Sequence, residues 1–98
     1  MNEEQLRRAL QSVGKSCFVR FFGEFSSSSM AREDVIEKLR LETDYTETSC
    51  ATRATHARSI VNAGLAKTAL NMVITSESSL VKEDIRVEAQ KWLDKLNS

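Results

Sequence analysis

The sequence has no proline, only three glycines and only two cysteines among its 98 residues. Proline and glycine are the residues least compatible with a helix interior, so their scarcity favours a chain that is nearly all helical with short connections. Two cysteines, Cys17 and Cys50, are too few for the dense disulfide set that is typical of small secreted domains. We therefore expect a cytoplasmic protein in which both thiols are reduced.

Long apolar runs are also lacking. No stretch approaches the roughly 18 apolar residues of a membrane span, and the polar, acidic start of the chain does not resemble a signal peptide. The formal net charge is zero, which argues against bulk electrostatic attraction to nucleic acid or anionic lipid. We expect no membrane partner.

Acidic residues are missing from one central segment. Residues 48–76 contain none of the 14 acidic residues, yet they include Arg53, Arg58, Lys67 and the only histidine, His56. A solvated helical surface normally mixes both signs of charge. This acid-free segment is therefore predicted either to be buried or to face an anionic partner.

Apolar residues recur with helical spacing along the whole chain, and β-type alternation is not seen. The periodicity predicts six helices, which cover about residues 3–13, 16–25, 30–41, 47–63, 65–75 and 80–96. The predicted fold is one all-α domain over residues 1–98, a compact bundle of five or six short helices in orthogonal or mixed packing.

Four residues are predicted to mark helix ends. Gly14 and Gly64 follow apolar stripes and suit the C-terminal cap. Ser29 is the expected N-cap of the helix over 30–41. Asp44, with Glu47 three residues later, is the expected capping box of the next helix.

The core is expected to form around aromatic side chains. All four phenylalanines lie within residues 16–25 at i, i+3, i+4 and i+7, which predicts the aromatic half of the core, with an exposed aromatic partner groove as the alternative. The segment 65–75 is hydrophobic around most of its circumference and is predicted to be the buried central helix. Trp92 lies on the apolar stripe of the last helix with Ile85 and Leu96, and we expect it to be buried.

Catalytic and cofactor motifs are not found. Gly14-Lys15-Ser16 resembles the end of a phosphate-binding loop, but the motif requires glycine where Ala9 stands. One histidine and two cysteines that are far apart do not supply a metal site. The carboxylate pairs lie on charged helix faces, where no desolvated pocket would shift their pKa. We expect no enzyme activity, no metal and no cofactor.

The helix over 47–63 carries the candidate binding surface. If Cys50, Ala54, Ala57 and Val61 face inward, the outward side is polar and free of acids. The predicted partner-binding residues are Arg53, Thr55, His56, Arg58, Ser59 and Asn62.

Two functions fit this surface. The first is a non-catalytic protein-interaction module, a small regulatory or accessory protein that acts through a helical surface on a protein partner, self-association included. The alternative is a helix-turn-helix-like DNA-binding regulator, in which short polar side chains read base edges while the arginines contact phosphates. The turn before this helix lacks glycine and the neighbouring helices are acidic, so nucleic acid is the less favoured partner.

Overall fold

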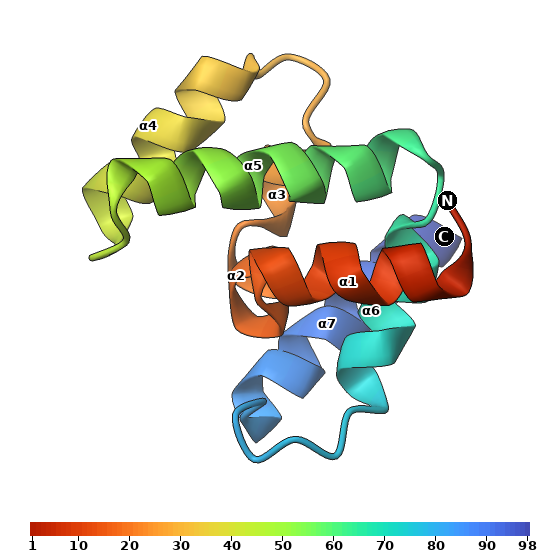
Figure 1. Cartoon of the computed structure of the whole chain (residues 1–98). Coiled ribbons are helices and arrows are strands. Elements are labelled where there is room, and N and C mark those ends of the chain that lie inside the picture. The colour runs from red at the N-terminus through yellow and green to blue at the C-terminus, as the bar shows by residue number, and fades with distance from the viewer.

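The computed structural model describes all 98 residues, Met1 to Ser98, and has the predicted all-α architecture. Its seven helices are α1 (Glu3–Val13), α2 (Lys15–Arg20), α3 (Phe22–Ser26), α4 (Arg32–Glu42), α5 (Glu47–Asn62), α6 (Ala66–Ile74) and α7 (Glu83–Asn97). α1 lies between the pair α4 and α5 on one side and the pair α6 and α7 on the other (Figure 1). None of these helices combines the length and the apolar character that crossing a membrane requires.

The central helix of the bundle is α5. It packs against α1, α3 and α4, whereas α6 packs mainly against α7. Only Ala69, Leu70 and Val73 of α6 are buried. The prediction that the segment 65–75 is the buried central helix is therefore wrong, because α6 lies at the edge of the bundle and its remaining apolar side chains, such as Met72, are only partly covered.

The hydrophobic core contains 22 buried residues, and none of them is polar or charged. Phe18, Phe22 and Phe25 are at most 1% exposed and Phe21 is 4% exposed, so the predicted aromatic core is confirmed. The rings of Phe18 and Phe22 meet edge to face with centroids 5.4 Å apart, a favoured aromatic geometry.

One predicted helix is divided in two. Phe21, with φ −111° and ψ 20°, leaves the helical region and separates α2 from α3. The hydrogen bonds from Phe21 N–H to the Cys17 carbonyl and from Phe25 N–H to the Phe21 carbonyl persist at 3.0 Å. The helical spacing in the sequence thus continues across a bend that periodicity alone does not reveal.

Trp92 is half-buried rather than buried. Its ring packs against Phe22, with centroids 5.1 Å apart, while Lys95 lies over it. Ala89 and Leu93 are the buried residues of α7, and Leu96 is 39% exposed. The predicted stripe is displaced because α7 contributes Leu93, rather than Leu96, to the core.

Helix ends agree with the prediction where glycine ends a helix. Gly14 and Gly64 adopt φ of +88° and +76° after α1 and α5. At the start of α1, Asn2 accepts from Gln5 N–H at 2.8 Å and Gln5 accepts from Asn2 N–H at 2.9 Å. This reciprocal pair satisfies two of the donors that a helix start leaves unpaired.

The two predicted N-caps are wrong. α4 is preceded by Ala31, because the hydroxyl of Ser29 pairs instead with that of Ser27 at 3.0 Å. α5 is capped by Thr46, whose hydroxyl oxygen accepts from Ser49 N–H at 3.1 Å. Serine and threonine side chains form hydrogen bonds with nearby backbone in turns as well as at helix caps. The residue type alone therefore does not show which residue caps a helix.

Candidate functional site

The inward side of α5 follows the prediction with one change. Cys50, Ala54 and Ala57 are fully buried, and Ile60 takes the place predicted for Val61, which is half-buried. The stripe continues at i+3 instead of i+4 because both spacings fall on one helix face. The exposed residues of the outward side are Thr52, Thr55, Ser59 and Asn62.

Arg53 reaches across to the end of α1. Its Nη1 donates to the Val13 carbonyl at 2.5 Å and its Nε donates to Ser49 Oγ at 3.0 Å. Its guanidinium carbon lies 3.7 Å from the centroid of the Tyr45 ring, which adds a cation–π contact. Arg53 thus joins α5 to the last carbonyls of α1.

Arg58 holds the serine-rich connection between α3 and α4. Its Nη2 donates to the Ser27 carbonyl at 2.9 Å and also to the Met30 carbonyl. Its Nε is buried and has no partner. Two arginines of the acid-free segment therefore donate to backbone carbonyls rather than to carboxylates.

Arg53, His56 and Arg58, which are among the predicted partner-binding residues, are all half-buried. The donors of the two arginines nevertheless point largely inward. The DNA-reading alternative stays a prediction, and Arg58, which was expected to reach a phosphate, donates to two backbone carbonyls instead.

The other predicted site residues do not gather around Arg53. Thr55 Oγ1 accepts from Arg32 Nε at 2.9 Å, and Ser59 Oγ donates to the Thr55 carbonyl at 3.0 Å. His56 and Ser59 line a shallow hollow of about 400 Å³ against α1. Asn62 is exposed at the end of α5. Their role in partner binding stays a prediction.

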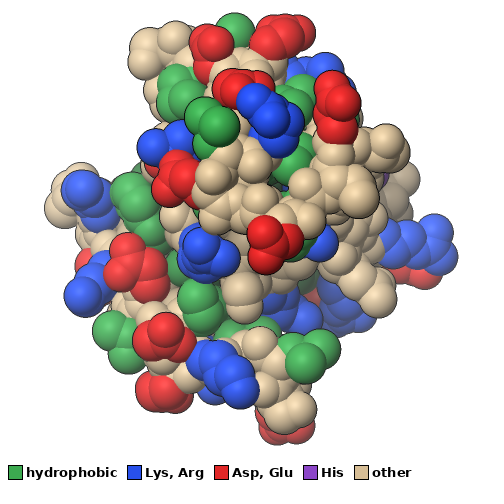
Figure 2. All heavy atoms as spheres, turned by 90° about the vertical axis from the view of Figure 1, so that its left-hand side faces the viewer, with side chains coloured by type: hydrophobic (Ala, Val, Ile, Leu, Met, Phe, Trp, Pro, Cys, Tyr) green, Lys and Arg blue, Asp and Glu red, His purple; other side chains and the backbone are tan.

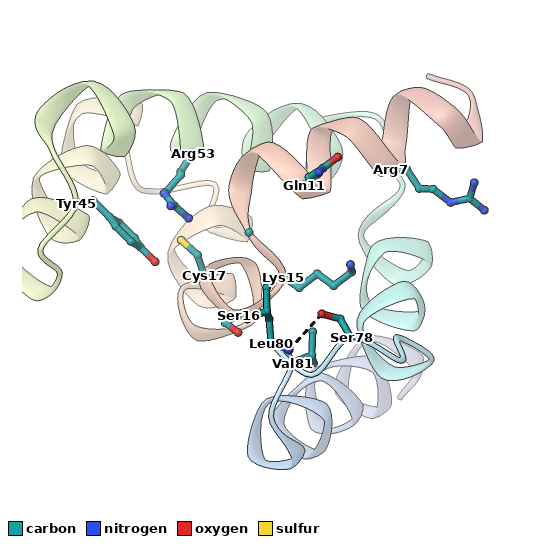
Figure 3. Close-up of a pocket in the computed structure, with 11 residues that line it drawn as sticks. Arg7, Gln11, Lys15, Ser16, Cys17, Tyr45, Arg53, Ser78, Leu80 and Val81 are labelled. Carbon is teal, nitrogen blue, oxygen red and sulfur yellow. Dashed lines mark hydrogen bonds between the residues drawn. The ribbon is translucent and has the colours of Figure 1, made fainter.

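A larger groove, of about 630 Å³, opens beside Arg53 between α1, α2, the start of α5 and the connection from α6 to α7 (Figure 3). We call it the α1–α5 groove. It is lined by Arg7, Gln11, Gly14, Lys15, Ser16, Cys17, Tyr45, Arg53, Ser78, Leu80 and Val81. This lining includes three basic residues and no acidic residue.

The basic side chains of the groove differ in how far they are neutralised. Arg7 pairs with Glu3 at 2.9 Å. Lys15 and Arg53 have no carboxylate within 4.0 Å. Arg53 Nη2 donates to no oxygen atom of the chain, whereas the other two nitrogens of its guanidinium are engaged and the Cys17 thiol interacts with the group. Two cations of the groove are therefore free to meet an anion.

An apolar area adjoins these cations. Leu80 is 82% exposed, the largest exposed fraction among the big hydrophobic residues. Val81 and the half-buried Tyr45 lie in the same lining. Figure 2 shows, on the side of the molecule where α4 ends and α5 begins, acidic and basic side chains side by side with hydrophobic ones between them. The charged residues of the groove lining, in contrast, are all positive.

The groove floor is not arranged for covalent chemistry. Burial raises the pKa of the Cys17 thiol, and this effect outweighs the opposing influence of Arg53. Desolvation likewise raises the pKa of Tyr45. Since the thiolate is the reactive form, Cys17 is a poor nucleophile at neutral pH. Cys17 and Cys50 are both free and buried, as predicted.

Arg53 is the one groove residue that the sequence predicted as part of a binding site, and the other residues of the lining were not predicted. Leu80 offered one signal, because it is a single large apolar residue that follows the polar run of residues 76–79. No three His, Cys, Asp or Glu side chains lie together in a way that could hold a metal ion. Comparison with protein-family models, with curated proteins and with solved structures finds no match to this chain.

Proposed function

We propose that the chain is a non-catalytic protein-interaction module, with a small regulatory or accessory role, that binds its partner in the α1–α5 groove. One observation carries this proposal. Leu80, 82% exposed, lines the same groove of about 630 Å³ as Lys15 and Arg53, and neither cation has a carboxylate within 4.0 Å. Exposed apolar side chains next to uncompensated charge are typical of surfaces that a partner covers.

The lining of the groove supports binding rather than catalysis. It contains no carboxylate and no histidine that could act as general acid or base. Its one thiol is held in the protonated form by burial. Hydroxyl, amide and guanidinium groups remain, and these recognise a partner without reacting with it.

Photocrosslinking tests the proposal directly. A benzophenone amino acid replaces Leu80, and the purified protein is irradiated in an extract of its source cells. The matched control carries the same group at Leu96, which is exposed in the last turn of α7 and lies outside the groove. We expect a specific protein adduct from position 80 alone, reproduced with the purified partner. Adducts from both positions, or from neither, would contradict the proposal.

A helix-turn-helix-like DNA-binding role is the second candidate, favoured by the exposed polar residues Thr52, Thr55, Ser59 and Asn62 along α5. A salt titration of binding to random duplex DNA tests it. Binding that weakens steeply as salt rises would support this candidate, because phosphate contacts release counterions. Absence of binding at low salt would remove it.

A further inference from the structure

We infer that the occupant of the α1–α5 groove is an acidic peptide segment that also carries an aliphatic or aromatic residue. This inference rests on the proposed function and specifies the chemistry of the partner. Three features of the groove carry it: its charge, the fixed guanidinium of Arg53, and the apolar area around Leu80.

The charge of the groove is locally uncompensated. The chain as a whole has 14 basic and 14 acidic residues, and all five ion pairs join residues three or four positions apart. Lys15, at the start of α2, takes part in none of them. A concave surface with cations and no acids concentrates a positive potential, which attracts carboxylates.

Arg53 is a pre-positioned donor. The Val13 carbonyl, Ser49 Oγ and the Tyr45 ring fix its guanidinium, the Cys17 thiol lies against it, and Nη2 donates to no oxygen atom of the chain. Figure 3 shows Arg53 extending from α5 toward Cys17, while Lys15 enters the groove from α2. Because the guanidinium is already ordered, a carboxylate that binds Nη2 costs little further side-chain entropy.

The apolar side chains of the groove indicate that its occupant carries an apolar group as well as an anion. Leu80 is 82% exposed, and it lies with Val81 and Tyr45 in the same lining as the cations. Inorganic phosphate or a nucleic-acid backbone would use the cations and leave Leu80 uncovered. A peptide supplies carboxylates and an apolar side chain together.

The groove also continues along α1. A neighbouring hollow of about 320 Å³ shares Arg7 and Lys15 with it and adds Met72 and Thr75. Glu3 also lines this second hollow, where it pairs with Arg7. Lys15 is thus the cation without a carboxylate that the two hollows share, and together they offer room for an extended segment of several residues.

Peptide selection tests the inference and requires no identified partner. The immobilised full-length chain is used to select from a display library of random dodecapeptides. We expect the selected peptides to be enriched in aspartate or glutamate together with leucine, isoleucine, phenylalanine or tryptophan. The dissociation constant of one selected peptide, labelled with fluorescein, is then measured by anisotropy.

Charge reversal at Lys15 is the decisive variant. We expect Lys15→Glu to weaken peptide binding by about tenfold or more, Lys15→Arg to preserve it, and Leu80→Ser to weaken it by about fivefold. The matched control is Lys91→Glu, an equal charge reversal at an exposed position of α7 outside the groove. Lys15→Glu places an acid in the first turn of α2, where the helix dipole favours it, and an unchanged melting curve would verify folding.

Several outcomes would overturn the inference: selected peptides without acidic enrichment, no selected peptide at all, an equal effect of Lys91→Glu, or full displacement of the peptide by an equal concentration of duplex DNA or inorganic phosphate. These results are distinct from failure of the proposed function. A protein adduct from position 80 whose crosslinked segment is not acidic removes the inference alone, whereas absence of any adduct removes the proposed function.

Discussion

At the scale of single residues, Gly14 meets two requirements at once. Its φ of +88° lies in a region that other residues rarely adopt, and an added Cβ would lie 2.8 Å from Arg53 Nη1. We expect Gly14→Ala to lower the free energy of unfolding by about 2–3 kcal/mol, because backbone strain and displacement of Arg53 add together. Urea denaturation measures this loss.

Gly64 is the control for that substitution. Its φ is +76°, but no atom lies within 4 Å of the position of a Cβ. Gly64→Ala should therefore cost only the conformational strain, about 1 kcal/mol. Equal losses for the two variants would show that Arg53 adapts freely and that its contact with Val13 is not a constraint.

The buried Cys17 thiol gives the stability a dependence on alkaline pH. Burial raises its pKa in the folded state, so the unfolded chain loses the thiol proton first as pH rises from about 8.5. The folded state then binds more protons, and the free energy of unfolding falls with increasing pH. The raised pKa of Tyr45 acts in the same direction at higher pH.

Denaturation of the wild type and of Cys17→Ala at neutral pH and at about pH 10 tests this linkage. We expect the wild type to lose stability over this range and the variant to lose less, whatever their difference at neutral pH. A loss of the same size in both proteins would assign the alkaline sensitivity to other groups.

At the scale of helices, two arginines connect elements that are far apart in the sequence. Arg53 holds α1 to α5, and Arg58 holds the connection between α3 and α4. We expect Arg53→Ala with Arg58→Ala to lower the free energy of unfolding by about 3–5 kcal/mol, because buried carbonyls would lose charge-assisted donors. Chemical denaturation of the double variant gives the value.

The matched control is Arg7→Ala with Arg8→Ala. These arginines pair with Glu3 and Glu4 on the exposed side of α1, where their side chains are 69% and 75% exposed. Exposed pairs of this kind contribute about 0–1 kcal/mol each. If both double variants lose the same stability, Arg53 and Arg58 do not join the helices as described.

Trp92 connects α7 to α3 with one face of its ring. We expect Trp92→Ala to cost about 2–3 kcal/mol, below the range for a fully buried aromatic residue, because the ring packs against Phe22 but is only half-buried. Leu96→Ala, at the exposed end of the same helix, should cost less than about 1 kcal/mol. Denaturation curves of the two variants compare them, and an equal loss would contradict the half-buried position of the indole.

The limits of a helix were predictable from the sequence where all of its local features indicated the same limits. α1 has the predicted limits because its apolar stripe, its charged face and Gly14 all agree. The bend at Phe21 was not predictable from periodicity, since the apolar spacing of the four phenylalanines continues unchanged across it. The same holds for Ile60, which replaces Val61 in the core by a choice between two equally helical spacings.

At the scale of the whole molecule, the acid-free segment shows that a charge pattern does not identify the groups that its arginines bind. The absence of acids near Arg53 and Arg58 is visible in the sequence, but the acceptors of these arginines are backbone carbonyls, which carry no sequence signal. The α1–α5 groove was not predictable for a related reason. Its lining comes from four separate stretches of the chain, and no periodicity relates Lys15 to Leu80.

The distribution of charge also separates the effect of salt on folding from its effect on binding. All five ion pairs lie within single helices, while the contacts of Arg53 and Arg58 between helices use carbonyls. Salt screens exposed pairs that contribute little to stability in any case. We therefore expect the free energy of unfolding to change by less than about 1 kcal/mol between low salt and about 0.5 M sodium chloride.

Over the same range, binding of an acidic peptide to the groove should weaken several-fold, because its carboxylates meet Lys15 at the protein surface. Denaturation and anisotropy titrations in the same buffers make the comparison. If salt lowered stability as strongly as binding, long-range attraction between helices would have to hold the bundle together, contrary to the local ion pairs that the structure contains.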